Sequence, residues 1–240
     1  MRTINFAKRN FKELVRDPLG MIFSILLPLF LLFIFQQFKI PSESFKLNNF
    51  TPGIIIFGFS FITLFTSTLV SKDRETSLLV RLGVSPMKGI DYILGYIIPI
   101  LILVIIQNIL FFILAIILGL EFSIYIIYSI LVSLLISILF IALGILIGSI
   151  FSNKSSSGIS SIVVQLVCFT SGMYFSTEMV GKGFKLICNI LPFESALNIL
   201  KNVLNNSVNL ISLKDVLVFS IYTIVVFILS IVVFKKKKLN

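Results

Sequence analysis

The chain has 240 residues, of which 58% are hydrophobic and only 12% are charged. A soluble domain of this length is about half apolar and a quarter charged, so the composition excludes an ordinary soluble domain and predicts an integral membrane protein. The 20 Lys and Arg residues, against 10 Asp and Glu residues, give a formal net charge of +10. The basic residues are scattered between apolar runs, which argues against binding to nucleic acid.

Residues 2–16 precede the first long apolar run, and we expect them to form an amphipathic helix. Basic residues occupy one side of this helix. The adjoining apolar stripe comprises Ile4, Ala7, Phe11, Leu14 and Val15. The pattern is typical of a helix that lies in the membrane interface, whereas anchoring by positive charge alone would not need the stripe. Pro18 disfavours helical geometry in the residue before it and should end the helix.

Six apolar runs are long enough to be membrane spans, because a spanning helix needs about 20 mostly apolar residues. The predicted spans are residues 19–38, 50–71, 93–118, 124–150, 156–176 and 215–234. No charged residue lies well inside any of them, where a single Lys or Asp would cost about 2.5–3.5 kcal/mol. The expected fold is therefore all-α, with a single membrane domain over residues 1–240.

The basic residues also predict the orientation of the chain. The first, third, fifth and seventh polar segments carry 14 Lys and Arg residues, and the alternate segments carry 6. By the positive-inside rule, both termini should lie on the cytoplasmic side. The first apolar run has no obvious small-residue cleavage site, so it is predicted to be a retained span and not a signal peptide.

Several polar residues lie deep within the predicted spans. In the fourth span Ser129, Ser133 and Ser137 recur at every fourth position, and Gly144 and Gly148 follow at the same spacing. Small residues in this pattern let helices approach closely. The most polar residues inside spans are Gln107, Asn108 and Gln165. Helix packing is the favoured role for both groups, and lining a substrate pathway is the alternative.

Residues 178–214 separate the last two predicted spans and are more than a simple loop. Apolar positions on both sides of Pro192 follow helical spacing, but each apolar face is too short to cross a membrane. We expect two short helices here, which re-enter the membrane or lie on its outer leaflet.

The chain lacks the residues of most catalytic and metal sites. It has no histidine, which excludes Ser/His and Cys/His nucleophiles and a Cys/His metal site, and its two cysteines are not expected to form a disulfide. It also lacks the phosphate-binding pattern G-x-x-x-x-G-K-[ST] and the intramembrane ionisable groups of ion-coupled carriers. A transporter of this kind would draw its energy from a separate subunit.

The stretch SKDRETSLLVRLGVSP follows the second predicted span and begins a polar loop over residues 72–91. A stop-transfer loop would explain Lys72 and Arg74, but not Asp73, Glu75 or the apolar side chains after them. A short helix closed by Gly83 and Ser85-Pro86 would present leucines to a partner. The charged residues could then fix the angle between this helix and the second span.

The chain resembles the permease subunits of type-2 ABC exporters, the ABC-2 family, over nearly its whole length. The resemblance rests on the order of RDP, TPGIIIFGFSF, DRE with RLGVSP, SGMYF and LPFESALNILK. It implies six spans, an N-terminal connecting helix, a cytoplasmic coupling helix in the loop after the second span and short re-entrant helices before the sixth.

The resemblance also implies the partners. Two permeases, identical or homologous, would pair in the cell membrane above two ATP-binding subunits, which would hold ATP and Mg, so that this chain carries no cofactor and no catalytic residue. The residues expected to couple to the ATPase are Lys72, Asp73, Arg74, Glu75, Leu78, Arg81 and Leu82. The expected substrate is an amphiphilic drug or a hydrophobic peptide. The alternatives are a self-contained channel or secondary carrier, and a non-transporting immunity or assembly protein.

Overall fold

The computed structural model describes residues 2–38, 40–76, 89–174 and 181–238. Within these ranges the chain is helical and contains no strand, so the expected all-α class is confirmed. The helices are α1 (Arg2–Val15), α2 (Pro18–Met21), the π-helix η1 (Ile22–Leu26), α3 (Leu27–Gln37), the 3-10 turn η2 (Glu43–Phe45), α4 (Leu47–Glu75), α6 (Gly89–Ile117), α7 (Ile124–Ile150), α8 (Asn153–Thr170), α9 (Lys182–Ile190), α10 (Pro192–Leu204), the 3-10 turn η4 (Val208–Leu210) and α11 (Leu213–Lys238).

Four of the described helices are long and apolar enough to cross a membrane. They are Leu47–Glu75, Asp91–Ile117, Ile124–Ile150 and Leu213–Lys236. The first predicted span is divided among α2, η1 and α3, and its apolar part, Ile22–Gln37, is shorter. The fifth corresponds to α8, which has 18 residues and a serine-rich first half. Six spans therefore remain a prediction.

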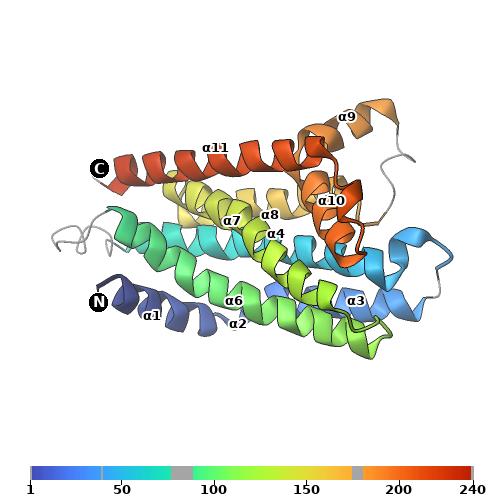
Figure 1. Ribbon diagram of the computed structural model, residues 1–240. Helices are drawn as coiled ribbons and strands as arrows, with labels where there is room; N and C mark the ends of the chain where they lie inside the picture. Colours follow the sequence, from blue (N-terminus) through green and yellow to red (C-terminus); the bar gives the residue numbers. More distant parts are fainter. Residues whose placement is uncertain (1, 39, 77–88, 175–180, 239–240) are drawn as a thin grey trace.

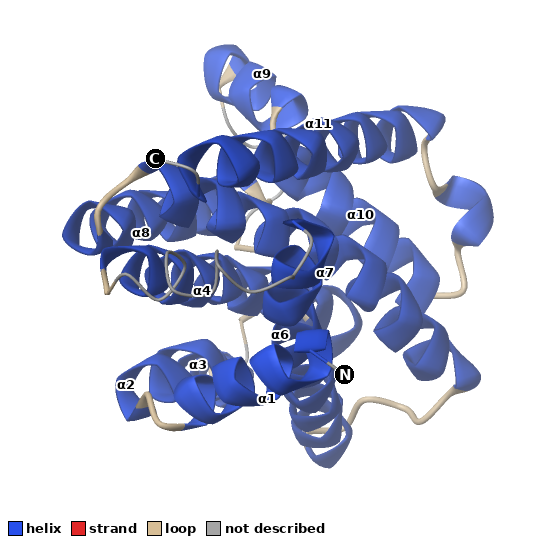
Figure 2. Ribbon diagram, turned by 90° about the vertical axis from the view of Figure 1, so that its left-hand side faces the viewer, coloured by secondary structure: helices blue, strands red, loops and turns tan. Residues whose placement is uncertain are grey.

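The helix α4 forms the centre of the bundle, with α7 and α8 on one side and α1 to α3 on the other (Figures 1 and 2). Gly144 and Gly148 of α7 allow this helix to pack closely against α4. A Cβ atom at Gly144 would lie 2.7 Å from the Thr63 carbonyl oxygen of α4, and one at Gly148 would lie 2.9 Å from Cβ of Val70. The glycine spacing therefore serves packing within this chain.

Two prolines inside the bundle leave backbone carbonyls that another helix must satisfy. Proline has no N–H, so the carbonyl four residues before it loses its helical donor. Pro28 frees the carbonyl of Ser24, which accepts a hydrogen bond from Gln107 Nε2 of α6 at 3.1 Å. The break coincides with the single turn of π-helix in η1. Gln107 thus joins α6 to the interrupted first apolar helix.

The second proline fixes the position of α1. Pro99 frees the carbonyl of Gly95 in α6, and Asn10 Nδ2 of α1 donates to this oxygen at 2.9 Å. Asn10 is fully buried together with the neighbouring face of α1. Of the predicted stripe, Ala7 and Leu14 belong to this buried face, whereas Ile4 and Val15 are more than half exposed. The choice of the buried face follows from the carbonyl that α1 binds.

Different segments of the chain lie at the two ends of the bundle. Both termini, the last turn of α4 and the start of α6 lie at one end, and α9 and α10 lie at the other (Figure 1). Helices α9 and α10 occupy the segment in which two short outer helices are predicted, and their depth in the membrane remains a prediction.

The glycine contact predicts a large difference between two alanine variants. Gly148→Ala should destabilise the protein by about 1–3 kcal/mol, the usual cost of overpacking a core. Gly158→Ala in α8 is the matched control, because a Cβ atom there meets nothing within 4 Å. It should be neutral or slightly stabilising. Thermal unfolding in detergent, followed by circular dichroism, measures both, and equal losses would contradict the packing described.

The proline carbonyl predicts a coupling between Asn10 and Pro99. Asn10→Ala should cost about 1–3 kcal/mol, because it leaves the Gly95 carbonyl buried without a donor. In a Pro99→Ala background the helix can supply that donor, and the same substitution should cost about 1 kcal/mol less. Asn10→Ala also removes the hydrogen bond from Arg9 to Asn10. That loss is the same in both backgrounds, so it cancels when the two costs are compared. An unchanged cost in the thermal unfolding assay would refute the assignment.

Candidate functional site

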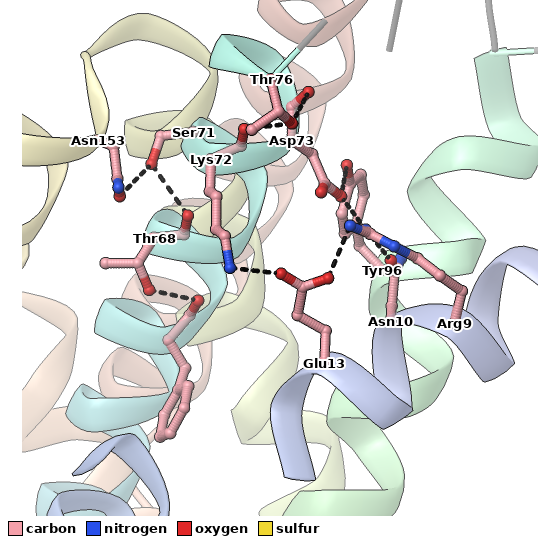
Figure 3. A network of polar contacts seen from close by, with 11 residues as sticks. Arg9, Asn10, Glu13, Thr68, Ser71, Lys72, Asp73, Thr76, Tyr96 and Asn153 are labelled. Atoms are coloured by element: carbon pink, nitrogen blue, oxygen red, sulfur yellow. Dashed lines mark hydrogen bonds and ion pairs between the residues drawn. The ribbon is translucent and has the colours of Figure 1, made fainter. Parts of the chain in front are cut away.

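The charged residues Lys72–Glu75 form the last turn of α4, where the sequence had placed the beginning of a loop. Each of the four side chains has a partner on or next to another helix. Figure 3 shows the partners of Lys72 and Asp73. Leu78, Arg81 and Leu82, the other residues of the predicted coupling site, lie outside the described residues.

Asp73 is the buried centre of this turn. Its side chain is 0% exposed, and its Oδ2 atom accepts hydrogen bonds from Arg9 Nη1 of α1 at 2.6 Å and from the Tyr96 hydroxyl of α6 at 2.9 Å. A carboxylate without solvent is tolerated only when it is paired and hydrogen-bonded. Asp73 therefore holds three helices together and faces the interior of the protein.

Glu13 of α1 forms the outer part of the same network (Figure 3). It lies 2.7 Å from Arg9 and 2.6 Å from Nζ of Lys72. Burial alone would raise the pKa of Glu13, but the hydrogen bond from Lys72 and the charge of Arg9 outweigh it, so this pKa lies below its usual value. Burial would lower the pKa of Arg9, yet its bond and charge interaction with Asp73 raise it.

The pKa of Glu13 determines how this network responds to acid. Because the pKa is lower in the folded chain than in the unfolded chain, the ionised side chain stabilises the fold at neutral pH. That stabilisation is lost in acid, as the pH falls through the pKa that Glu13 has in the folded chain.

Arg74 and Glu75 bind the two helix ends that meet in the turn between α7 and α8. Arg74 donates to the carbonyls of Ser149 and Phe151, where the last carbonyls of α7 lack helical donors. Glu75 Oε1 accepts from the backbone N–H of Asn153, the first residue of α8, at 2.9 Å. Each charge also has the sign that the helix dipole favours at that end.

We call the turn Lys72–Glu75, together with its partners on α1, α6, α7 and α8, the α4 junction. It joins one end of α4 to four other helices, immediately before residues 77–88. Among the described residues no group of His, Cys, Asp or Glu side chains could hold a metal ion.

The six polar residues predicted for a pathway or for helix packing differ in burial. Gln107, Asn108, Ser129, Ser133 and Ser137 are fully buried among packed helices. The hydroxyls of Ser133 and Ser137 bond to carbonyls of their own helix at 2.7 Å. Gln165 alone is exposed, on α8.

Sequence reasoning missed Arg9, Glu13 and Tyr96, which complete the junction. Glu13 is the one acidic residue in a segment rich in Lys and Arg, and that exception was the available signal. Tyr96 carried none, because an aromatic residue near the end of a span is common for other reasons.

Removing Asp73 should weaken the junction strongly. Asp73→Ala leaves Arg9 and the Tyr96 hydroxyl without their acceptor, and we expect a loss of about 3 kcal/mol, the lower end of the range for a broken buried pair. The control is Glu43→Ala, which removes an exposed pair with Lys46 and should change little. Thermal unfolding compares the two, and similar small losses would show that the Asp73 network is energetically unimportant.

The sequence was also compared with known proteins. A family model described as ABC-2 type transporter matches residues 3–205, which is most of the chain. A search of curated proteins found no significant match.

Proposed function

Because this chain belongs to the ABC-2 type transporter family, we propose that it is the permease subunit of an ATP-driven exporter and forms half of the translocation pathway. A membrane domain of this family is a permease component of an ABC transporter and is normally not catalytic. ATP and Mg would bind to two copies of a separate ATP-binding subunit.

The α4 junction is the observation that carries the proposal. Residues 77–88 follow it directly, and they contain the leucine-rich stretch that would dock on the ATPase. A displacement of this stretch by the ATPase would be transmitted to α4 first. Since Asp73, Arg74 and Glu75 bind three different parts of the bundle, that displacement would also reach α1, α6, α7 and α8. The junction would therefore convert a local displacement into a movement of the bundle.

The exposed face of α8 supports a pair of permeases. Lys154, Gly158, Ser161 and Gln165 recur along one side of this helix, and all four are exposed. Polar side chains that faced lipid tails would be unfavourable. A second permease, identical or homologous, with a polar path between the two copies, would remove this cost. Gln165 is then the polar residue best placed to contact a substrate.

Orientation and substrate complete the proposal. The end that carries both termini also carries α1 and the α4 junction, where basic residues are concentrated, so we place it in the cytoplasm. The cell membrane is the proposed location. A path that is mostly apolar, with scattered Ser and Gln, suits amphiphilic drugs or hydrophobic peptides.

The test uses the complex of this chain with its ATP-binding subunit. The complex is purified from native membranes through a tag on this chain and is then reconstituted in liposomes. Leu78→Ala/Leu82→Ala should leave insertion and ATP hydrolysis in place, while ATP-driven export falls to background, because the apolar contact to the ATPase is lost. The matched control is Leu210→Ala/Leu213→Ala, two leucines that are each 74% exposed at the opposite end of the bundle.

Two outcomes would contradict the proposal. Normal export by the Leu78/Leu82 variant would remove the coupling role of residues 77–88. Uptake by the purified chain without any ATPase, driven by an ion gradient, would replace the permease with a self-contained carrier.

A further inference from the structure

The end of α11 carries the longest uninterrupted run of basic residues in the chain. Residues 235–238 are all lysine, they follow the apolar part of α11 directly, and the helix continues through them. We call this run the lysine end. Orientation of the chain needs positive charge at this end of the bundle, but it does not need four lysines within about one turn of helix.

Helix α11 lies at the edge of the bundle and presents a long apolar face to its surroundings. It lies opposite α1 to α3 in both overall views (Figures 1 and 2) and packs mainly on α7 and α10. Six of its outward side chains are 46–59% exposed, namely Ile221, Ile224, Val225, Ile228, Leu229 and Val232. The proposed second permease and the polar path belong to the exposed face of α8, so this face of α11 is left to lipid.

The first two lysines stand on the same side of α11 as the apolar face. Side chains three, four or seven residues apart share one side of a helix. Lys235 is therefore aligned with Ile228 and Val232, and Lys236 is aligned with Leu229 and Val232. Both lysines are exposed, and neither forms an ion pair with any other residue that the structure describes. An acyl chain along this face would thus end beside two available cations.

The lysine end is held in place by the residue before it. Phe234 is only 2% exposed, and the centre of its ring lies 6.4 Å from that of Tyr92 and 6.1 Å from that of Tyr96 in α6. Asp91, which precedes Tyr92, accepts a hydrogen bond from the Thr3 hydroxyl at 2.8 Å, and a single carboxylate cannot neutralise four lysines. The end of α11 therefore keeps a fixed position and an excess of positive charge.

We propose that the lysine end binds the headgroups of anionic phospholipids in the membrane leaflet next to the two termini. Their phosphates would lie against Lys235 and Lys236, and their acyl chains would lie along Leu229 and Val232. Clusters of lysine directly after a membrane helix attract acidic lipids in this way. The bound lipids would hold the end of α11, and through Phe234 the start of α6, at a fixed depth in the membrane.

An anionic lipid fits this surface better than a segment of protein does. The apolar face extends about 17 Å along the helix from Ile221 to Val232. This length is close to half of the hydrocarbon core of a bilayer, which is about 30 Å thick. An acidic protein segment would satisfy the lysines but would leave the apolar face uncovered. The proposal requires that the chain lies in a membrane, but it does not require that the chain exports anything.

The experiment uses the purified chain in vesicles, so its result is independent of ATP-driven export. The chain contains no tryptophan, and Val232→Trp therefore introduces a single fluorophore about one turn before Lys236. The vesicles consist of phosphatidylcholine with a small, fixed share of either phosphatidylglycerol or phosphatidylcholine that is brominated on its acyl chains. Bromine quenches a tryptophan that it contacts, so the quenching measures how much of each brominated lipid lies beside the lysine end.

We expect brominated phosphatidylglycerol to occupy this position roughly tenfold more than brominated phosphatidylcholine does, because each lysine near the surface attracts an anionic headgroup. Adding Lys235→Gln/Lys236→Gln should lower the preference several-fold. Adding Lys235→Arg/Lys236→Arg should retain it, which separates loss of charge from loss of fold. High salt should also lower the preference, since ions screen exposed charges.

Two controls separate the lysine end from general effects of charge. Lys46→Gln/Lys154→Gln removes the same charge from exposed lysines elsewhere, and it should leave the preference unchanged, because Lys46 is paired with Glu43 and Lys154 begins a serine-rich stretch. Ile117→Trp, used in place of Val232→Trp, puts the fluorophore at a side chain that is 74% exposed at the other end of α6. It should show no preference for phosphatidylglycerol, because the nearest charged residue along the chain is Glu121.

Each opposite result would overturn the proposal. Equal quenching by the two brominated lipids would leave the lysines with a role in orientation alone. An unchanged preference after Lys235→Gln/Lys236→Gln would place the anionic lipid elsewhere. No quenching by either lipid would show that protein covers this face of α11.

Discussion

The structure depends on one constraint, which is that backbone groups removed from water need hydrogen-bond partners. Pro28 and Pro99 each break this rule within their own helix by leaving a carbonyl without a donor. Gln107 and Asn10 restore it from other helices, and in doing so they fix how α6 packs on the first apolar helix and how α1 packs on α6. A carbonyl without a donor in one helix thus determines which helix packs there and in what position. Apolar contact is less selective, because it has no fixed direction.

The same constraint explains the charge at the end of α4. Helix ends leave donors and acceptors exposed, and Arg74 and Glu75 satisfy those of α7 and α8 with the sign that each helix dipole favours. Asp73 adds a buried ion pair with Arg9, which is tolerated because Tyr96 also donates to it. The last turn of α4 is therefore a structural joint between α4 and four other helices.

How much of the site could be predicted differs from residue to residue. Consecutive charges between apolar runs drew attention to Lys72–Glu75, because a stop-transfer loop would not explain Asp73 and Glu75. Their partners could not be found in this way, since Arg9 and Tyr96 lie 64 and 23 residues from Asp73 along the chain. The buried face of α1 could be predicted only in part, for a related reason. Helical spacing identifies an apolar stripe, but Asn10 is buried because of a carbonyl on another helix.

The sequence by itself determined the all-helical membrane class, the family and the end of the first helix before Pro18, because length, apolar content and proline act locally along the chain. Only the tertiary structure decided which helix donates to each carbonyl that a proline leaves without a donor. It also showed that the charges after the second apolar run are the end of a helix. These features depend on contacts between distant residues, and such contacts exist only once the helices have packed.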